Sequence, residues 1–196
     1  MYGIYDNSNV IAQFTAPISV RSNVPVFAVD ALSLKRQVTK RPAQRWEVEA
    51  SLEPLSFGAN KLFSYIVKKG DFSVVTIVMP QNYGAKKALT SSSTPTATAS
   101  AFSSNVVISG NTGLIPSGTF VKFGNHSKIY MTTSDLNGNG SVGIFPELRT
   151  SMSAIGMVFR DDVIMNAFID TDSVKGMSYV DGILMDLGTM KFVEAL

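Results

Sequence analysis

Apolar and polar residues alternate along much of the chain, which is the pattern of β-strands with one solvated face. The alternation covers residues 16–21, 29–38 and 45–54, and Pro54 is expected to end the third strand. The residues of that strand predicted to face inward are Trp46, Val48, Ala50 and Leu52. We therefore expect the single tryptophan to anchor a core.

Helical spacing replaces the alternation between residues 56 and 70. The apolar positions that recur there are Phe57, Leu62, Phe63, Ile66 and Val67. Ser56 can cap the start of a helix, and Lys68, Lys69 and Gly70 suit its end, where cations and a flexible residue complement the unpaired carbonyls. Residues 71–80 then read as a buried strand ended by Pro80. The first eighty residues predict an α+β unit in which one helix covers an antiparallel β-sheet or sandwich.

Residues 81–104 have no periodicity and are rich in Ser, Thr and Ala. This composition is typical of a linker or loop. A polar segment of that length needs a surface to lie against, and a neighbouring subunit would supply one.

Short strands separated by turn residues follow, at 105–110, 118–124, 127–134 and 141–148. Several short strands divided by Gly and Asn favour a small barrel or sandwich, and we expect an OB-like β-barrel.

Strand-like segments continue beyond Thr150, and they are expected to return to the first unit. The prediction is thus a mainly β (α+β) fold in which residues 1–81 and 151–196 form a sheet-and-helix domain. Residues 82–150 would be an inserted OB-like domain.

The stretch DLNGNGSVG, residues 135–143, matches two functional motifs at once. Its Asp-x-Asn-x-Asn-Gly order copies half of a calcium-binding EF-hand loop, but the twelfth position is Pro146 rather than a glutamate, and both flanks predict strands instead of helices. The GxGxxG dinucleotide motif fails because no helix follows its glycines. Asn and Gly tolerate the positive φ that tight turns require, so the stretch predicts a β-hairpin turn.

Composition excludes several classes of site. The 196 residues include no cysteine, which excludes disulfides, zinc-thiolate sites and cysteine nucleophiles. The N-terminal sequence does not read as a secretion signal, and no apolar run approaches the roughly 18 residues needed to span a bilayer.

Charge is divided unevenly along the chain, although its total is only +2. Residues 1–87 carry 11 basic and 6 acidic side chains, whereas residues 88–196 carry 6 and 9. Such a division can produce head-to-tail contacts between identical subunits, but charge alone favours ordinary solvated surface charge.

Few residues suggest catalysis. His126 lies between two predicted strands, where a capping or solvated role is expected rather than general-base chemistry. Asp161 and Asp162 are adjacent and would point to opposite faces of a strand, and Asp170 and Asp172 suit a solvated edge. We therefore predict no catalytic residues, no cofactor-binding residues and no metal ligands. A basic cluster, expected at a subunit interface or facing a channel, consists of Lys35, Arg36, Lys40, Arg41 and Arg45.

The order of segments resembles that of the distal tail proteins of long-tailed bacteriophages, the Dit family. The likeness covers about residues 30–196. It is carried mainly by the strand pair Gly118–Phe123 and Lys128–Thr132 and by Pro146, Leu148 and Arg149, which are similar to the family's "P-x-L-r" ending. Thr119 departs from the family, which often has an acidic residue at that position.

The resemblance implies a structural virion protein and not an enzyme. Such proteins form a ring, usually of six subunits, that joins the tail tube to the tip or baseplate and surrounds the DNA channel.

The implied partners are further copies of the chain, the tail tube protein, tail hub or tip proteins, and receptor-binding or fibre proteins. DNA would only pass through the channel, and no membrane insertion is implied. The implied location is the phage tail tip, after assembly in the host cytoplasm. Alternatives are another tail-tube or tail-completion ring protein and an OB-fold carbohydrate-binding module.

Overall fold

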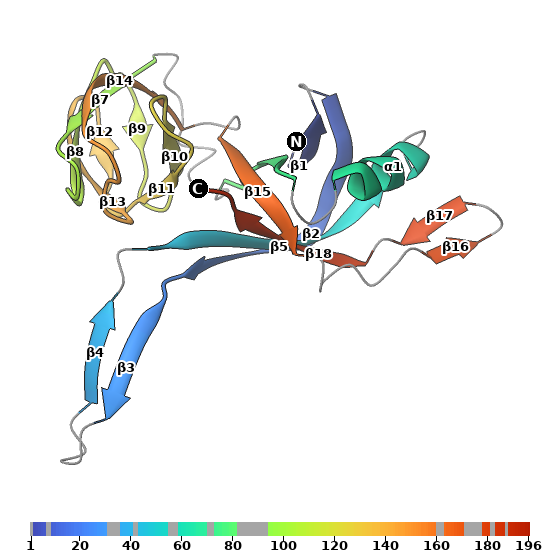
Figure 1. The fold of residues 1–196 in the computed structure, drawn as a ribbon. Helices are drawn as coiled ribbons and strands as arrows, with labels where there is room; N and C mark the ends of the chain where they lie inside the picture. Colours follow the sequence, from blue (N-terminus) through green and yellow to red (C-terminus); the bar gives the residue numbers. More distant parts are fainter. Residues whose placement is uncertain are drawn as a thin grey trace.

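The structure is a computed structural model, and it describes residues 2–6, 9–30, 36–40, 43–54, 59–69, 73–81, 94–159, 163–170, 178–180, 183–186 and 188–196. These residues form antiparallel strands and one short helix, arranged as two closed barrels with projecting two-stranded ribbons (Figure 1). The predicted mainly β fold with a barrel is confirmed.

The first barrel contains six strands from both ends of the chain. In order around the barrel they are β1 (Gly3–Asp6), β2 (Asn9–Asn23), β5 (Arg45–Pro54), β18 (Thr189–Glu194), β15 (Ile164–Asp170) and β6 (Val75–Val78), and β6 pairs with β1 to close it. The four residues of β5 predicted to face inward are all buried, which confirms its register. The first unit is thus a closed barrel, whereas the sequence predicted a sheet or sandwich.

The helix α1 (Ala59–Lys69) packs on the first barrel through Leu62 and Ile66, which are buried in its core. The side chain of Val67, predicted to lie on the same apolar face, is exposed. The proposed capping residue Ser56 and the terminal Gly70 lie outside the described residues. No helix in the described part of the chain is long and apolar enough to cross a membrane.

The second barrel is also closed by six antiparallel strands. Their order is β10 (Phe120–Phe123), β11 (Ile129–Thr132), β13 (Gly140–Phe145), β8 (Asn105–Ser109), β7 (Thr96–Ala99) and β14 (Met152–Val158). The short strands β9 (Leu114–Ile115) and β12 (Leu136–Asn137) pair beside it. An OB fold has five strands, so this barrel has one more than the expected type.

The structure differs from the predicted organisation at one loop and at one domain boundary. Strand β7 lies within the segment 81–104, for which the sequence predicted only a loop; small Thr and Ala residues can alternate between core and solvent without producing a strong hydropathy signal. Strand β14 lies in the second barrel although it falls in the predicted returning segment 151–196. The return to the first barrel comes between Phe159, which belongs to the second core, and Val163, which belongs to the first.

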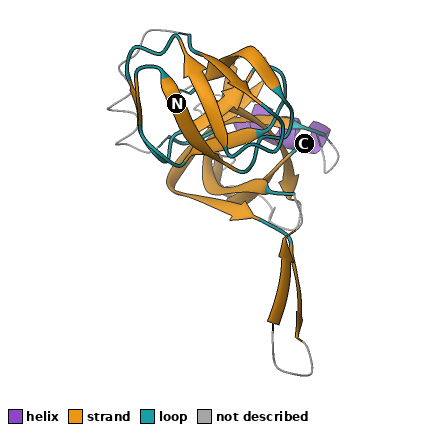
Figure 2. Cartoon of the chain, turned by 90° about the vertical axis from the view of Figure 1, so that its left-hand side faces the viewer, coloured by secondary structure: helices purple, strands orange, loops and turns teal. Residues whose placement is uncertain are grey.

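Two ribbons project from the first barrel. Strands β3 (Val26–Asp30) and β4 (Arg36–Lys40) pair with each other and form an arm that extends well away from both barrels (Figures 1 and 2). The alternation at 29–38 predicted one strand, and this prediction was wrong, because these residues belong to two paired strands. Apolar and polar residues can keep alternating from one strand of a hairpin into the next, so the hydropathy pattern alone does not separate the two strands. Strands β16 (Ser178–Val180) and β17 (Ile183–Asp186) form a second ribbon.

The hairpin predicted for DLNGNGSVG is confirmed. Strands β11 and β13 on either side of it pair antiparallel, and β12 lies within the connection. Gly138 has φ +71°, which an L-residue rarely adopts. The Asp135 carboxylate accepts a hydrogen bond from the Ser117 amide (2.7 Å). This contact ties the start of the connection between β11 and β13 to the neighbouring loop.

Candidate functional site at the junction of the two barrels

The two barrels meet around Trp46, at the start of β5. Its indole N–H donates to the carbonyl of Ile129 in the second barrel (2.8 Å), and its ring stands perpendicular to that of Phe120 with the centroids 5.2 Å apart. Phe120 and Ile129 are buried in the same apolar cluster as the first barrel's core. The core of the first barrel therefore continues across the junction.

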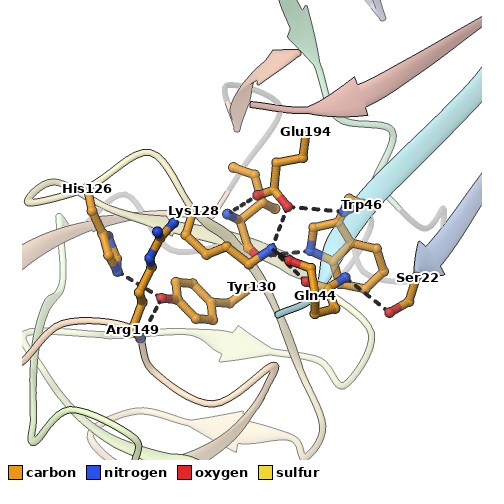
Figure 3. Close-up of polar contacts among 9 residues, drawn as sticks. Ser22, Gln44, Trp46, His126, Lys128, Tyr130, Arg149 and Glu194 are labelled. Atoms are coloured by element: carbon orange, nitrogen blue, oxygen red, sulfur yellow. Dashed lines mark hydrogen bonds and ion pairs between the residues drawn. The ribbon is translucent and has the colours of Figure 1, made fainter. Parts of the chain in front are cut away.

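A buried carboxylate joins both barrels at this point (Figure 3). Glu194 is fully buried at the end of β18, and its two oxygens accept hydrogen bonds from the amides of Trp46 (3.0 Å) and Ile129 (2.8 Å). Trp46 belongs to the first barrel and Ile129 to the second, so one side chain fixes a strand from each.

Lys128 is the counter-ion of Glu194. Its ammonium group also donates to the backbone carbonyl (2.9 Å) and the side-chain carbonyl (2.5 Å) of Gln44, whose amide in turn donates to the Ser22 hydroxyl (3.0 Å). Burial lowers the pKa of Lys128 from its ordinary value, and the Glu194 carboxylate opposes that change. A lowered lysine pKa means that burial disfavours the charged amine, and the attraction of the buried carboxylate offsets part of that cost.

Two further contacts tie the barrels together. The side chain of Gln81, where the first barrel's chain leaves β6, accepts a hydrogen bond from the Phe120 amide (2.9 Å) and donates to the Phe120 carbonyl (2.8 Å). Lys122 on β10 donates to the carbonyl of Ile164 on β15 (2.9 Å). Polar groups on both sides of the junction are thus paired across it, which fixes the relative position of the barrels.

Beside this network lies a pocket of about 600 Å³. It is lined by residues of both barrels, among them Phe102, Phe145, Leu148, Arg149, Lys128 and Leu196. The Phe102 side chain is 72% exposed, and its φ of +63° is a strained conformation for an L-residue. Hydrogen bonds from Phe102 N to the Leu148 carbonyl (2.7 Å) and from Leu148 N to the Ser103 carbonyl (2.9 Å) hold the backbone there.

His126 and Tyr130 form a second polar group in the second barrel (Figure 3). The Arg149 amide donates to the Tyr130 hydroxyl (3.0 Å), and the same hydroxyl is hydrogen-bonded to His126 Nε2 (2.8 Å). Burial lowers the pKa of His126 and raises the pKa of Tyr130 to about 12. The sequence predicted a capping or solvated histidine, whereas in the structure the ring is half-buried and hydrogen-bonded to a buried tyrosine.

The structure describes three of the five residues of the predicted basic cluster. Arg36 and Lys40 are the two ends of β4, opposite Asp30 and Val26, and Arg45 begins β5 at the base of the arm. Lys35 and Arg41 lie outside the described residues.

Of the two acidic pairs, only Asp170 lies in the described part of the chain. Asp161, Asp162 and Asp172 lie outside the described residues, and Asp170 forms an ion pair with Lys191 (3.6 Å). Among the described residues, no three His, Asp or Glu side chains are placed to hold a metal ion.

The sequence reasoning missed the residues that form the junction. One signal was present: in β18 the alternation that buries Met190 and Phe192 continues to Glu194, so a carboxylate occupies an inward-facing position. A charged residue in phase with a buried face needs a buried partner. The sequence does not indicate that the partner is Lys128, because that contact joins two separate barrels.

In comparisons with models of protein families and with curated proteins, nothing matches this chain.

Proposed function

We propose that the protein is a structural component of a phage tail tip, a ring-forming subunit of the distal tail type. In this proposal the first barrel forms the ring around the DNA channel and the second barrel projects from it. The partners would be further copies of the chain, the tail tube protein, tail hub or tip proteins and receptor-binding or fibre proteins. The site of action would be the virion. The resemblance in segment order and in the strand pair 118–132 is one support for this reading.

The observation that carries the proposal is the buried junction around Trp46, Lys128 and Glu194. It gives a subunit of two closed barrels a fixed shape, and head-to-tail contacts close into a ring only if each subunit repeats the same rotation. The arm adds a second support, because it extends well away from both barrels (Figure 1).

The experiment is a class-averaged negative-stain micrograph of the purified protein, together with light scattering. We expect rings with one rotational order, and a mass that is the corresponding multiple of 21.1 kDa. A chain that stays solitary at high concentration, and that joins no larger particle, would contradict the proposal. Another tail-tube or tail-completion ring protein would also give rings, and binding to purified tail tubes or tail tips would separate these readings.

A second candidate function is carbohydrate binding in the pocket beside the junction. The observation that favours it is the exposed Phe102, whose backbone has a positive φ and which lines the pocket together with Arg149. A flat aromatic surface next to polar groups suits a sugar ring. Binding to an oligosaccharide panel that is lost in Phe102→Ala and kept in Val107→Ala, an exposed apolar residue of β8, would support this function.

A further inference from the structure

The first barrel carries two ribbons whose outer strand edges are open. In a closed barrel every strand has a neighbour on each side, so backbone groups of both barrels are paired. In the described part of the chain, the arm (β3–β4) and the ribbon β16–β17 are each a two-stranded sheet with free outer edges. Figure 1 shows them at opposite ends of the molecule, the arm at the lower left and the ribbon at the right.

A further strand would stabilise the arm. An isolated two-stranded ribbon is marginal in water even with a good turn. The strands of the arm have five residues each, and two of its apolar side chains, Val26 and Val29, are 57% and 47% exposed. Pairing with another strand would bury these valines and satisfy the free backbone groups of one edge.

The two ribbons carry opposite charge. Residues 26–40, from the start of β3 to the end of β4, carry Lys35, Arg36 and Lys40 against Asp30, a net charge of +2. Residues 178–186, from the start of β16 to the end of β17, carry Asp181 and Asp186 and no basic residue, a net charge of −2. Like charges disfavour contact between two arms, whereas opposite charges favour contact between an arm and a ribbon.

We propose that the arm of one copy pairs with the β16–β17 ribbon of the next copy. Because the ribbons lie at opposite ends of the first barrel, this contact is head-to-tail and continues from copy to copy until it closes. The inference rests on the proposed ring function and names the surface that would form the ring.

Cysteine cross-linking tests the inference, because the chain has no cysteine of its own. Val29→Cys places a thiol on the arm and Ser178→Cys places one on β16. Each variant alone, treated with a short bis-maleimide, should give no covalent dimer, whereas a mixture of the two should give one. The double variant should give a ladder of covalent oligomers that stops at the number of subunits in the ring. Arg36→Cys is a second arm position if Val29→Cys fails to fold.

Each outcome decides between specific alternatives. Rings in the micrograph without a cross-link in the mixture, at both arm positions, overturn the inference and leave the proposed function standing. A covalent dimer from Val29→Cys alone shows arm-to-arm pairing and also overturns the inference. A chain that remains solitary and gives no cross-link overturns both proposals. Reversal of charge by Arg36→Glu should reduce the yield of the mixed cross-link about tenfold at low salt, and an unchanged yield would exclude the electrostatic part of the argument.

Discussion

The residues that join the barrels are buried charges, and this determines how they respond to substitution. Lys128→Met leaves the Glu194 carboxylate buried without its counter-ion, and Glu194→Gln leaves the Lys128 ammonium in the same state. We expect each single substitution to lower the free energy of unfolding by about 3–5 kcal/mol. The double substitution Lys128→Met/Glu194→Gln should cost less than the sum, with a coupling of about 1–3 kcal/mol, because it leaves no unpaired charge. Denaturant unfolding of the four proteins measures these values.

A surface ion pair is the matched control for this cycle. Arg21 and Glu49 lie 3.8 Å apart on the first barrel, and both side chains are exposed. Arg21→Met should change the free energy of unfolding by less than about 1 kcal/mol. Additive losses in the Lys128/Glu194 cycle would show that the two residues act independently.

His126 gives stability a dependence on pH at the residue scale. Burial lowers its pKa below the ordinary value of 6.5. Above pH 6.5 the imidazole is neutral in both the folded and the unfolded chain, so its contribution to stability is constant. As pH falls below 6.5 the unfolded chain takes up the proton first, and the free energy of unfolding decreases until the folded pKa is reached. Because His126 is the only histidine, NMR titration of its ring measures this pKa directly.

His126→Gln is the control for the pH dependence. Its side-chain amide can still form a hydrogen bond with the Tyr130 hydroxyl, but it does not titrate. The decrease in stability just below pH 6.5 should be absent in this variant. A titration midpoint of the native ring at or above 6.5 would contradict the prediction of a lowered pKa.

At the scale of elements, β14 contains a local irregularity that a substitution can relieve. Its pairing with β7 shifts register between Met152 and Ile155, and Ala154 in this bulge has φ +51°. An L-residue in the left-handed region costs about 1–2 kcal/mol relative to glycine, which is partly offset by the greater freedom of glycine in the unfolded chain. We expect Ala154→Gly to raise the free energy of unfolding by about 0.5 kcal/mol, measured by denaturant unfolding.

The control for this substitution lies on the neighbouring strand. Ala99 pairs with Met152, and its φ is not in the positive range. Ala99→Gly should lower the free energy of unfolding by about 0.5–1 kcal/mol, since glycine in a strand loses more freedom on folding. The same sign for both substitutions would mean that the bulge is not strained.

Strands were predicted correctly where large apolar and charged side chains alternate. They were missed where the apolar and polar residues differ little in size and hydropathy, or where the alternation runs on from one strand into the next. In β5 the large inward residues contrast with Glu and Ser outside, which set its boundaries and register. In β7 the sequence Thr-Ala-Thr-Ala offers little contrast, although Ala97 is fully buried. In the arm the pattern alone does not reveal that Asp30 and Arg36 belong to two paired strands.

At the scale of the whole molecule, the sequence predicted two β units but not how they close or join. Closure depends on pairs such as β1 with β6 and β10 with β14, which join residues far apart in the chain. Local hydropathy carries no information on such pairs. The junction was beyond prediction for the same reason, since Glu194 and Lys128 are 66 positions apart and lie in different barrels.

The junction also leads to a prediction about the shape of the molecule. Spin labels at Val74→Cys near β6 and Val107→Cys on β8, both exposed positions in a chain without cysteine, report the distance between the barrels. We expect a narrow distance distribution, because the junction contacts are buried. Glu194→Ala removes the acceptor of the Trp46 amide, the Ile129 amide and the Lys128 ammonium at once, so the distribution should broaden under conditions in which both barrels remain folded.

The matched control is Glu49→Ala, which removes a carboxylate from the same barrel at a position outside the junction, and it should leave the distribution narrow. If the distance distribution of the Glu194→Ala variant also stays narrow, the apolar contacts of Trp46 with Phe120 and Phe145 are sufficient to hold the barrels.

A ring requires every subunit to repeat one geometry, so a broadened distance distribution should be accompanied by rings in which the outer barrels are blurred in class averages. In that case the polar junction sets the position of the second barrel, and the contacts of the first barrel set the ring.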